Sequence, residues 1–279
     1  MRIGIVANLS KPHVNSLLPE LVGWLNTHKQ EVYFFDNGFN HSGITSCKDS
    51  DEFLSAVEMV LAIGGDGTLL KASHIIGSKG IPILGINLGG LGFLTEVRKD
   101  ELYPALTKVL ASEYQIEERM VLEAVVKGEK LYGLNDIVIV GSGSGRMLQF
   151  ELWINGSYTS NFLADGLIVS TPTGSTAYSL AALGPVVEPA MECVVVNLIC
   201  PHTFGARPIV ISAASTIEVK CTAPSFVVVA DGQEKILLSN NEAIKFKKAD
   251  YKIKLVQSGF RDFYEVLRTK LKWGGGKER

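Results

Sequence analysis

The stretch Leu61-Ala62-Ile63-Gly64-Gly65-Asp66-Gly67-Thr68-Leu69-Leu70 runs from an apolar segment through a glycine-dense turn into a predicted helix start. Glycines let backbone N–H groups approach phosphate oxygens, and the N-terminus of the following helix adds partial positive charge. Asp66 would oppose an anion there unless it bound a metal ion or accepted a proton. An Asp-Gly pair alone is more often simple turn chemistry. The two preceding glycines and the following Thr68 favour a catalytic Asp66.

Strand-like and helix-like runs alternate on both sides of this turn, from residue 1 to about residue 117. The strand-like runs cover residues 3–7, 32–35, 59–63 and 82–86, and the helix-like runs cover residues 15–28, 68–76 and 101–112. This alternation is typical of an α/β domain with an open, mostly parallel sheet. Ligands bind beyond the carboxyl ends of such strands, where both glycine-rich turns, 64–68 and 85–92, are found.

After about residue 118 the pattern changes to short β-branched runs separated by turns. Examples of these runs are residues 121–126, 135–140, 149–154, 194–199, 216–221 and 226–229, and the pattern predicts a β-rich second domain. Residues 263–271 are predicted to be helical and are followed by glycines and a charged tail. We therefore expect domains at 1–117 and 118–256 and a C-terminal segment at 257–279.

The composition excludes several classes of protein. The 279 residues carry a net charge of −2, with 20% charged and 46% hydrophobic residues, as in an ordinary globular enzyme. No broad basic field attracts nucleic acid or an anionic membrane, and no apolar run reaches the roughly 20 residues of a membrane span. A cytoplasmic location is expected. Four cysteines (Cys47, Cys193, Cys200 and Cys221) lack zinc-site spacing, so we expect them to be reduced and to have packing roles.

A second polar cluster lies at residues 165–179, with the sequence DGLIVSTPTGSTAYS. A strand is predicted to end at Thr171, and Thr173 to Thr176 offer hydroxyl and N–H groups to a ligand, while Tyr178 can stack on a planar ring. The alternative is a helix with a capping Ser or Thr. The chain lacks a Walker lysine loop, and Asn8-Leu9-Ser10-Lys11 stands where a G-x-G-x-x-G motif would follow the first strand.

Taken together, these segments resemble the NAD kinases of bacterial type. The matching segments are Gly64 to Thr68, Gly89 to Leu94, Asn135-Asp136, Asp165 to Tyr178, Pro201-His202-Thr203 with Arg207-Pro208, and Lys270 to Gly274. They span nearly the whole chain. The first is shared with diacylglycerol, sphingosine and phosphofructokinase-type enzymes, and Asn-Asp is common in turns, whereas the long block from Asp165 is specific to NAD kinases.

The resemblance implies an N-terminal α/β domain, a β-sandwich-like NAD-binding domain and a final segment that returns to the first domain. It also implies transfer of the terminal phosphoryl group of ATP, or of polyphosphate, to the 2′-hydroxyl of the adenosine ribose of NAD. Mg²⁺ or another divalent cation would accompany ATP. NAD and ATP would be the partners, without nucleic acid or membrane, and the chain would form a homodimer or homotetramer.

The resemblance further implies roles for individual residues. Asp66 would take the proton of the 2′-hydroxyl. Gly67 would border the phosphate donor, Lys71 would meet phosphate, and Phe93 would lie against the adenine. The remaining NAD-binding residues are expected to be Asn135, Asp136, Arg146, Asp165, Thr173, Thr176, Ala177, Tyr178, Ser179, Ala181 and Gln233.

Two alternatives remain at this point: a lipid kinase of the diacylglycerol or sphingosine type, which shares the Gly64 to Thr68 motif, and a non-catalytic NAD-binding sensor. The polar block at 173–179 argues against an acyl channel, and Asp66 argues against a sensor. Gly90 and Leu163 stand where relatives often carry basic residues. The sequence leaves open how these two positions affect binding and regulation, and whether NADH is accepted.

Overall fold

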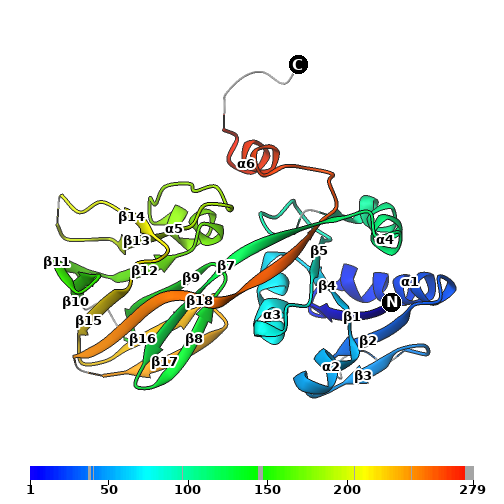
Figure 1. The fold of residues 1–279 in the computed structure, drawn as a ribbon, viewed down its shortest axis with the longest axis horizontal. Helices are drawn as coiled ribbons and strands as arrows, with labels where there is room; N and C mark the ends of the chain where they lie inside the picture. The colour runs from blue at the N-terminus through cyan, green and yellow to red at the C-terminus, as the bar shows by residue number, and fades with distance from the viewer. Residues whose placement is uncertain are drawn as a thin grey trace. The chain divides into compact units, whose positions relative to one another are not determined.

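The computed structural model describes residues 1–36, 39, 41–95, 97–143, 147–203, 205–239 and 241–273. The chain forms two compact units (Figure 1), residues 1–118 with 253–279 (unit 1) and residues 119–252 (unit 2). Unit 1 is an α/β unit on a parallel sheet, and unit 2 is an antiparallel β sandwich, which confirms the predicted fold class. Among the described residues, no helix is long and apolar enough to cross a membrane.

The sheet of unit 1 has the strand order β3-β2-β1-β4-β5, with the end of β18 beyond β5, and every pairing along it is parallel. Its strands are β1 (Arg2–Ala7), β2 (Glu31–Phe35), β3 (Thr45–Cys47), β4 (Met59–Gly64) and β5 (Ile83–Asn87), and β6 (Val97–Arg98) also pairs with β5. The chain moves outward from β1 to β3 and returns on the other side of β1 with β4. Open α/β sheets bind ligands at such a reversal, beyond the carboxyl ends of the strands.

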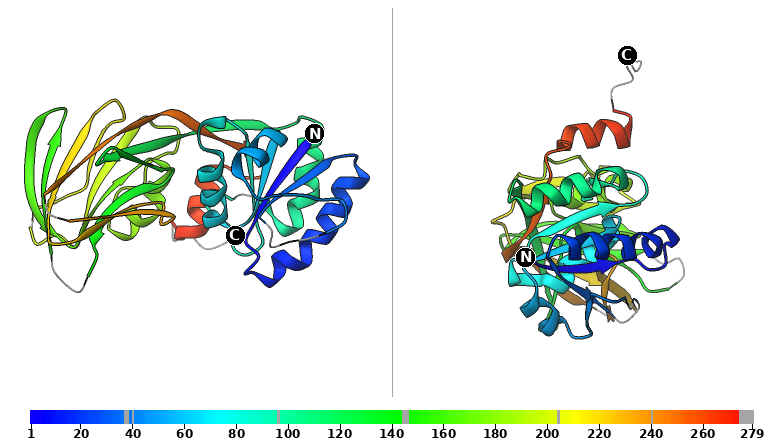
Figure 2. Two further views of the ribbon diagram at one scale, coloured as in Figure 1. Left: turned by 90° about the horizontal axis from the view of Figure 1, so that it is seen from below. Right: turned by 90° about the vertical axis from the view of Figure 1, so that its right-hand side faces the viewer.

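Helices cover both faces of this sheet, as Figure 2 shows. They are α1 (Pro12–Thr27), α2 (Ser50–Ala56), α3 (Asp66–Ile76) and α4 (Leu102–Leu110), with short 3₁₀ turns η1 (Gly77–Lys79) and η2 (Lys99–Glu101). A further helix, α6 (Phe263–Leu271), follows β18. Ile3 and Ile5 share a buried core with the apolar sides of α1 and α4. Gly4 points to the other face, where a Cβ would lie 2.5 Å from Phe53 of α2. The sheet is thus packed between two layers of helices.

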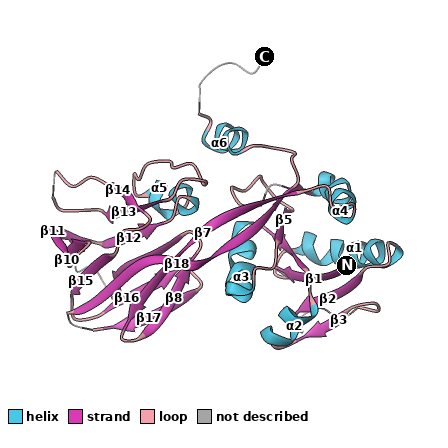
Figure 3. Cartoon of the chain, viewed as in Figure 1, coloured by secondary structure: helices cyan, strands magenta, loops and turns pink. Residues whose placement is uncertain are grey.

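Unit 2 consists mainly of strands (Figure 3). One sheet has the order β14-β13-β12-β9-β16-β17. Its strands are β9 (Asp136–Gly141), β12 (Gly166–Ser170), β13 (Cys193–Ile199), β14 (Ile209–Ser212), β16 (Phe226–Ala230) and β17 (Glu234–Leu238). The other sheet contains β7 (Gln115–Val126), β8 (Glu129–Gly133), β10 (Leu148–Ile154), β11 (Ser157–Ala164), β15 (Ile217–Thr222) and β18 (Glu242–Gln257). Phe150 of β10 and Phe226 of β16 belong to one buried core.

Two elements of unit 2 interrupt this pattern, the 3₁₀ turn η3 (Thr173–Thr176) and the short helix α5 (Tyr178–Ala181). They follow β12, where the sequence predicted a strand end and a helix start. The packing role predicted for the cysteines holds for the buried Cys47, Cys193 and Cys221 but is wrong for Cys200, which is exposed. Cys200 has a φ of 46° and stands immediately after β13 ends, outside the buried part of that strand.

Candidate functional site

The turn after β4 carries the residues predicted to do chemistry. β4 ends at Gly64 and α3 begins at Asp66, so the carboxylate stands in the first turn of a helix. Gly64 has to be glycine because a Cβ there would lie 2.3 Å from the Oγ1 of Thr68. Lys11, the N-cap residue of α1, donates through Nζ to the carbonyl oxygen of Gly64 at 2.9 Å. This contact joins the start of α1 to the end of β4, beside the reversal of the sheet.

The Asp66 carboxylate accepts four hydrogen bonds from the segment that follows β5. Oδ1 accepts the backbone N–H of Leu94 at 3.2 Å, the N–H of Thr95 at 3.1 Å and the Thr95 hydroxyl at 2.8 Å. Oδ2 accepts the N–H of Phe93 at 3.0 Å. Among the described residues, Oδ2 therefore accepts one hydrogen bond and Oδ1 accepts three, so Oδ2 is the oxygen better placed to accept a further proton.

The second glycine-rich turn is shaped around this carboxylate. A Cβ on Gly92 would lie 2.1 Å from the Oδ1 of Asp66, so a larger residue would push the segment away. Asn87, at the end of β5, donates through Nδ2 to the Oγ1 of Thr95 at 3.0 Å and accepts the N–H of Gly89 at 3.0 Å. The two glycine-rich turns of the sequence thus form one hydrogen-bonded network in unit 1. Asn87 and Thr95 were missed by sequence reasoning, although the flanking glycines marked the segment.

The other predicted residues of unit 1 lie around this network. Gly67 and Lys71 are exposed on α3, and Phe93 is half-buried. In the described part of the chain, no group of three or more His, Cys, Asp or Glu side chains could hold a metal ion. Mg²⁺ in phosphotransfer sites is held by substrate phosphates, water and only one or two carboxylates. The carboxylate of Asp66 could supply one such ligand, with the other ligands coming from water and from donor phosphates bound near the helix N-terminus.

In unit 2, a pocket of about 420 Å³ brings together several predicted NAD-binding residues. It is lined by Asn135, Asp136, Val138, Val140, Ala177, Tyr178, Val229, Asp231 and Gly232. The pocket thus joins residues at and within β9, residues at the start of α5, and residues of β16 and the turn after it, which are about 40 to 100 positions apart in the sequence. Most of the wall is apolar, and Asn135, Asp136 and Asp231 add a few carboxyl and amide groups, which is typical of small-molecule sites.

Asp231 organises one wall of this pocket and was missed by sequence reasoning. Its carboxylate accepts the backbone N–H groups of Leu134 at 2.7 Å, Asn135 at 2.7 Å and Asp136 at 3.1 Å. Its own N–H donates to the carbonyl oxygen of Asp136 at 3.0 Å. The Asp-Gly pair at 231–232, directly after an apolar run, is the signal that could have drawn attention to it.

Asp136 is the carboxyl group most altered by its surroundings. It is only 5% exposed. Burial, and secondarily the negative charge of Asp231, raise the pKa of Asp136 to about 7, against the opposing effect of a hydrogen bond from the Tyr178 N–H. A carboxyl group with a shifted pKa at the wall of a pocket is a candidate binding group.

The turn after β12 is built closely against Asn135. A Cβ on Gly174 would lie 1.9 Å from the carbonyl oxygen of Asn135, so only glycine fits there. The buried Thr173 accepts a hydrogen bond from Nη1 of the buried Arg119 at 3.3 Å. The Thr176 hydroxyl donates to the carbonyl oxygen of Thr173 at 3.2 Å. Thr173 and Thr176 therefore stabilise the turn and do not line the pocket.

Ser179, Asp165, Ala181 and Gln233 are described by the structure but are not among the residues that line the pocket. Ser179 is fully buried, and its carbonyl oxygen accepts a hydrogen bond from the Nδ2 of Asn197 at 3.1 Å. Asp165, Ala181 and Gln233 are exposed, and Gln233 follows the pocket residue Gly232 directly. Arg146 lies outside the described residues. The roles of all these residues stay predictions.

Tyr178 provides a direct test of the pocket. Its side chain is 45% exposed at the start of α5 and lines the pocket. Tyr178→Ala should weaken NAD binding about 2- to 12-fold from the lost stacking alone, since such contacts contribute about 0.5–1.5 kcal/mol beyond burial. Isothermal titration of NAD measures this, with Tyr158→Ala, an exposed tyrosine on β11, as the control. An unchanged dissociation constant in Tyr178→Ala would remove Tyr178 from the binding site.

Comparison with known proteins identifies the family. The family model described as the ATP-NAD kinase N-terminal domain matches residues 3–114, and that of the ATP-NAD kinase C-terminal domain matches residues 134–258. This chain belongs to the ATP-NAD kinase family. The NAD kinase of Geobacter metallireducens is 41% identical over 98% of this chain and 99% of its own length. That of Moorella thermoacetica is 42% identical over 99% of this chain and 91% of its own length.

Solved structures agree with the family. The crystal structure of an NAD kinase from Archaeoglobus fulgidus in complex with ATP has a TM-score of 0.80 at 28% identity, covering 96% of this chain and 99% of that chain. Yeast NADH kinase complexed with NADH has a TM-score of 0.92 at 22% identity, covering 100% of this chain and 89% of that chain, and this likeness concerns the fold.

Proposed function

We propose that this chain transfers the terminal phosphoryl group of ATP to the 2′-hydroxyl of the adenosine ribose of NAD and thereby produces NADP. The observation that carries the proposal is the Asp66 carboxylate, in the first turn of α3 and beside the reversal of a parallel sheet, in a member of the ATP-NAD kinase family. The two NAD kinases named above align with this chain over 99% and 91% of their own lengths.

The chemistry of the reaction requires a group such as Asp66. A hydroxyl is a weak nucleophile at neutral pH, and a positioned general base contributes about 10²- to 10⁴-fold to its rate of attack. The Oδ2 of Asp66, which accepts a single hydrogen bond from the described residues, would take the proton of the 2′-hydroxyl. The backbone N–H groups of the turn at 64–68 would face the donor phosphates. Mg²⁺ would neutralise the charge of the donor phosphates.

Unit 2 would contribute NAD binding. Its pocket combines the exposed face of Tyr178, which suits a planar ring, with the carboxyl and amide groups of Asn135 and Asp136. The same pocket argues against a lipid kinase, and both family models are those of ATP-NAD kinases. A sensor without activity would have no use for Asp66 at the helix start. A homodimer or homotetramer, as the resemblance implies, is part of the proposal.

The proposal is tested by incubating the purified chain with Mg²⁺, ATP and NAD and measuring NADP. Parallel reactions replace NAD by a diacylglycerol, by 2′-deoxy-NAD or by NADH, and replace ATP by polyphosphate. We expect NADP from NAD, no phosphorylated lipid, and binding of 2′-deoxy-NAD without product. Phosphorylation of the 2′-deoxy compound would exclude the 2′-hydroxyl as the acceptor, and absence of NADP with folded protein would exclude the function.

A further inference from the structure

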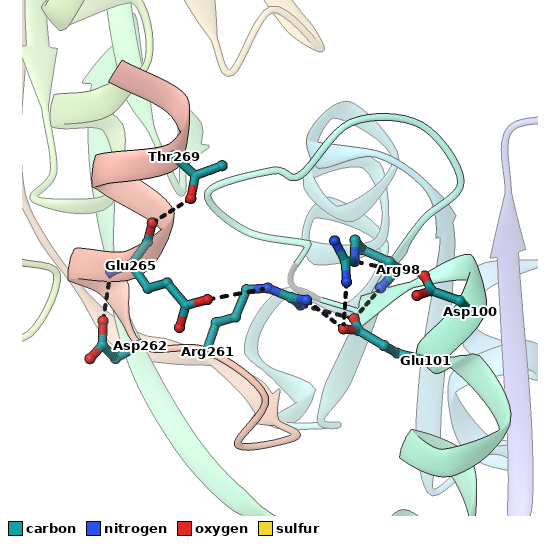
Figure 4. Close-up of polar contacts among 7 residues, drawn as sticks. All are labelled: Arg98, Asp100, Glu101, Arg261, Asp262, Glu265 and Thr269. Atoms are coloured by element: carbon teal, nitrogen blue, oxygen red, sulfur yellow. Dashed lines mark hydrogen bonds and ion pairs between the residues drawn. The ribbon is translucent and has the colours of Figure 1, made fainter. Parts of the chain in front are cut away.

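The last helix of the chain, α6, is fixed to the body of unit 1 at its start (Figure 4). Arg261 donates through Nη1 to the Oε2 of Glu101 at 2.9 Å and through Nη2 to Oε1, which makes a two-pronged ion pair. The two side chains are only 10% and 15% exposed. These hydrogen bonds hold the pKa of Glu101 at about 2, well below its ordinary value. The Glu101 carboxyl group is therefore ionised at neutral pH, opposite the Arg261 guanidinium.

The helix itself begins in a defined way. Asp262 caps it by accepting the N–H of Glu265 at 2.7 Å, and the Thr269 hydroxyl donates to the carbonyl oxygen of Glu265 at 2.9 Å (Figure 4). Val266 and Leu267 bury the inner side of the helix. The ion pair of Arg261, the cap by Asp262 and the buried residues Val266 and Leu267 together hold α6 in place, including its last turn.

That last turn reaches the segment that holds Asp66. The Nζ of Lys270 donates to the carbonyl oxygen of Leu91 at 2.7 Å and lies 5.5 Å from the centroid of the Phe93 ring. Leu91 and Phe93 flank Gly92, the residue that packs against the Asp66 carboxylate. The Phe93 N–H is the donor to the Oδ2 of Asp66. Lys270 thus contacts Leu91 and Phe93, the residues on either side of Gly92.

We infer that Lys270 is a positioning residue for the reaction, which acts by holding segment 91–95 against the Asp66 carboxylate. Among the described residues, a backbone hydrogen bond from the Gly92 N–H to the carbonyl oxygen of Thr95 at 3.3 Å closes the turn. Residues 93–95 are also bonded to Asp66 and Asn87, so the start of the segment, at Leu91, is where a contact from outside adds restraint. Lys270 is suited to this role because, among the described residues, its ammonium forms no ion pair that would draw it away from Leu91. The inference rests on the proposed function, since it gives Asp66 a role in catalysis.

The inference gives a role to Lys270, the first residue of the motif at 270–274, to which the proposed chemistry assigns no task. The ammonium is a cation with three donors, and a hydrogen bond from a charged group is stronger than a neutral one. The contact also covers one face of the Phe93 ring through a cation–π interaction. Both contacts restrain the backbone whose N–H groups hold Asp66, so loss of the ammonium should affect the transition state more than NAD binding.

The test compares Lys270→Met with Arg268→Met in the intact chain. Arg268 is an exposed cation on the same helix, and among the described residues it makes no hydrogen bond or ion pair, so the control removes the same charge without the contact. We expect kcat of Lys270→Met to fall about tenfold, with KM for NAD changed less than about twofold. Lys270→Arg, which keeps a charged donor, should recover most of the rate. The control should retain wild-type kcat.

Hydrogen exchange provides a readout that does not depend on activity. The amides of a peptide that covers residues 91–95 should exchange faster in Lys270→Met than in the wild type and in Arg268→Met, while melting temperatures agree. Wild-type kcat and unchanged exchange in Lys270→Met would overturn the inference, and so would equal losses in both variants. If the wild type makes no NADP, the proposed function fails, whereas the exchange experiment still decides whether Lys270 holds the segment.

Discussion

Asp66→Asn should lower turnover by about 10²-fold or more while the dissociation constant of NAD changes little. The substitution keeps the size of the side chain and removes its ability to accept the ribose proton. The structure adds a second consequence. The carboxylate accepts N–H groups at both oxygens, from Phe93 at Oδ2 and from Leu94 and Thr95 at Oδ1, and an amide nitrogen cannot accept at either place.

A matched control separates these two consequences. Thr95→Val removes the hydroxyl that donates to Oδ1 at 2.8 Å but leaves the carboxylate intact. If proton transfer is the function of Asp66, Thr95→Val should keep most of the rate that Asp66→Asn loses. Equal losses in both would show that the shape of the segment matters and the proton does not. Partial recovery of Asp66→Asn at high Mg²⁺ would indicate a metal ligand, and near-normal turnover in folded Asp66→Asn would leave only a turn residue.

The sequence was informative wherever the signal is local. Gly64, Asp66 and the apolar residues on either side predicted a strand, a tight turn and a helix start, and β4 and α3 meet there. The helix at 263–271 was predicted with the bounds it has. The helix predicted at 15–28 instead begins at Pro12, because proline is well suited to the first helical turn and lacks the N–H that would be unpaired there.

Other strands were missed because charged residues alternate with their buried residues and make the segment look like a surface loop. In β18, Ile244 and Phe246 are buried while Lys245 and Lys247 point to the other side, so a 16-residue strand has the composition of a surface segment. The short edge strand β17 was missed for the same reason, since Glu234 and Lys235 open it. Alternation with period two decides such cases better than composition does.

Contacts between distant segments could not be read from the sequence. Thr95 lies 29 positions from Asp66, and Asp231 lies 96 positions from Asn135. The first contact depends on β4 and β5 being neighbours, and the second on the pairing of β9 with β16. The sequence pattern contains no information on which strands become neighbours. Thr95 and Asp231, which hold the residues of the two sites, could therefore be identified only from the structure.

The stability of unit 2 should fall as the pH rises from about 4 to about 7. Burial and the charge of Asp231 raise the pKa of Asp136 from 3.8 to about 7 in the folded chain. In that pH range the folded state therefore binds more protons than the unfolded state, and the free energy of unfolding decreases with pH. The change in pKa corresponds to roughly 4 kcal/mol over the whole range. Bound NAD would increase the free energy of unfolding further at any pH, because it binds the folded state.

Asp231→Asn should destabilise unit 2 at pH 5 by roughly 2 to 4 kcal/mol and weaken NAD binding. An amide keeps an acceptor for Asn135 and Asp136 at Oδ1 but turns an N–H donor toward the buried N–H of Leu134, which loses its partner at Oδ2. The substitution also removes the charge that helps to raise the pKa of Asp136, so the decline with pH should be smaller.

Urea denaturation at pH 5 and pH 8 measures both effects of Asp231→Asn. Asp250→Asn is the matched control, because Asp250 belongs to the same unit, its side chain is 91% exposed and its ion pair with Lys247 spans 4.0 Å. The control should follow the wild type at both values of pH. The free energy of unfolding of Asp231→Asn should be well below that of the wild type at pH 5. The difference should be smaller at pH 8, because the wild type loses more stability than the variant between these two pH values. If Asp231→Asn instead matched Asp250→Asn at pH 5, the three hydrogen bonds of Asp231 would contribute nothing to the turn that forms the wall of the pocket. Asn135 and Asp136 would then be held by their contacts with the end of β12, at Ser170 and Thr171.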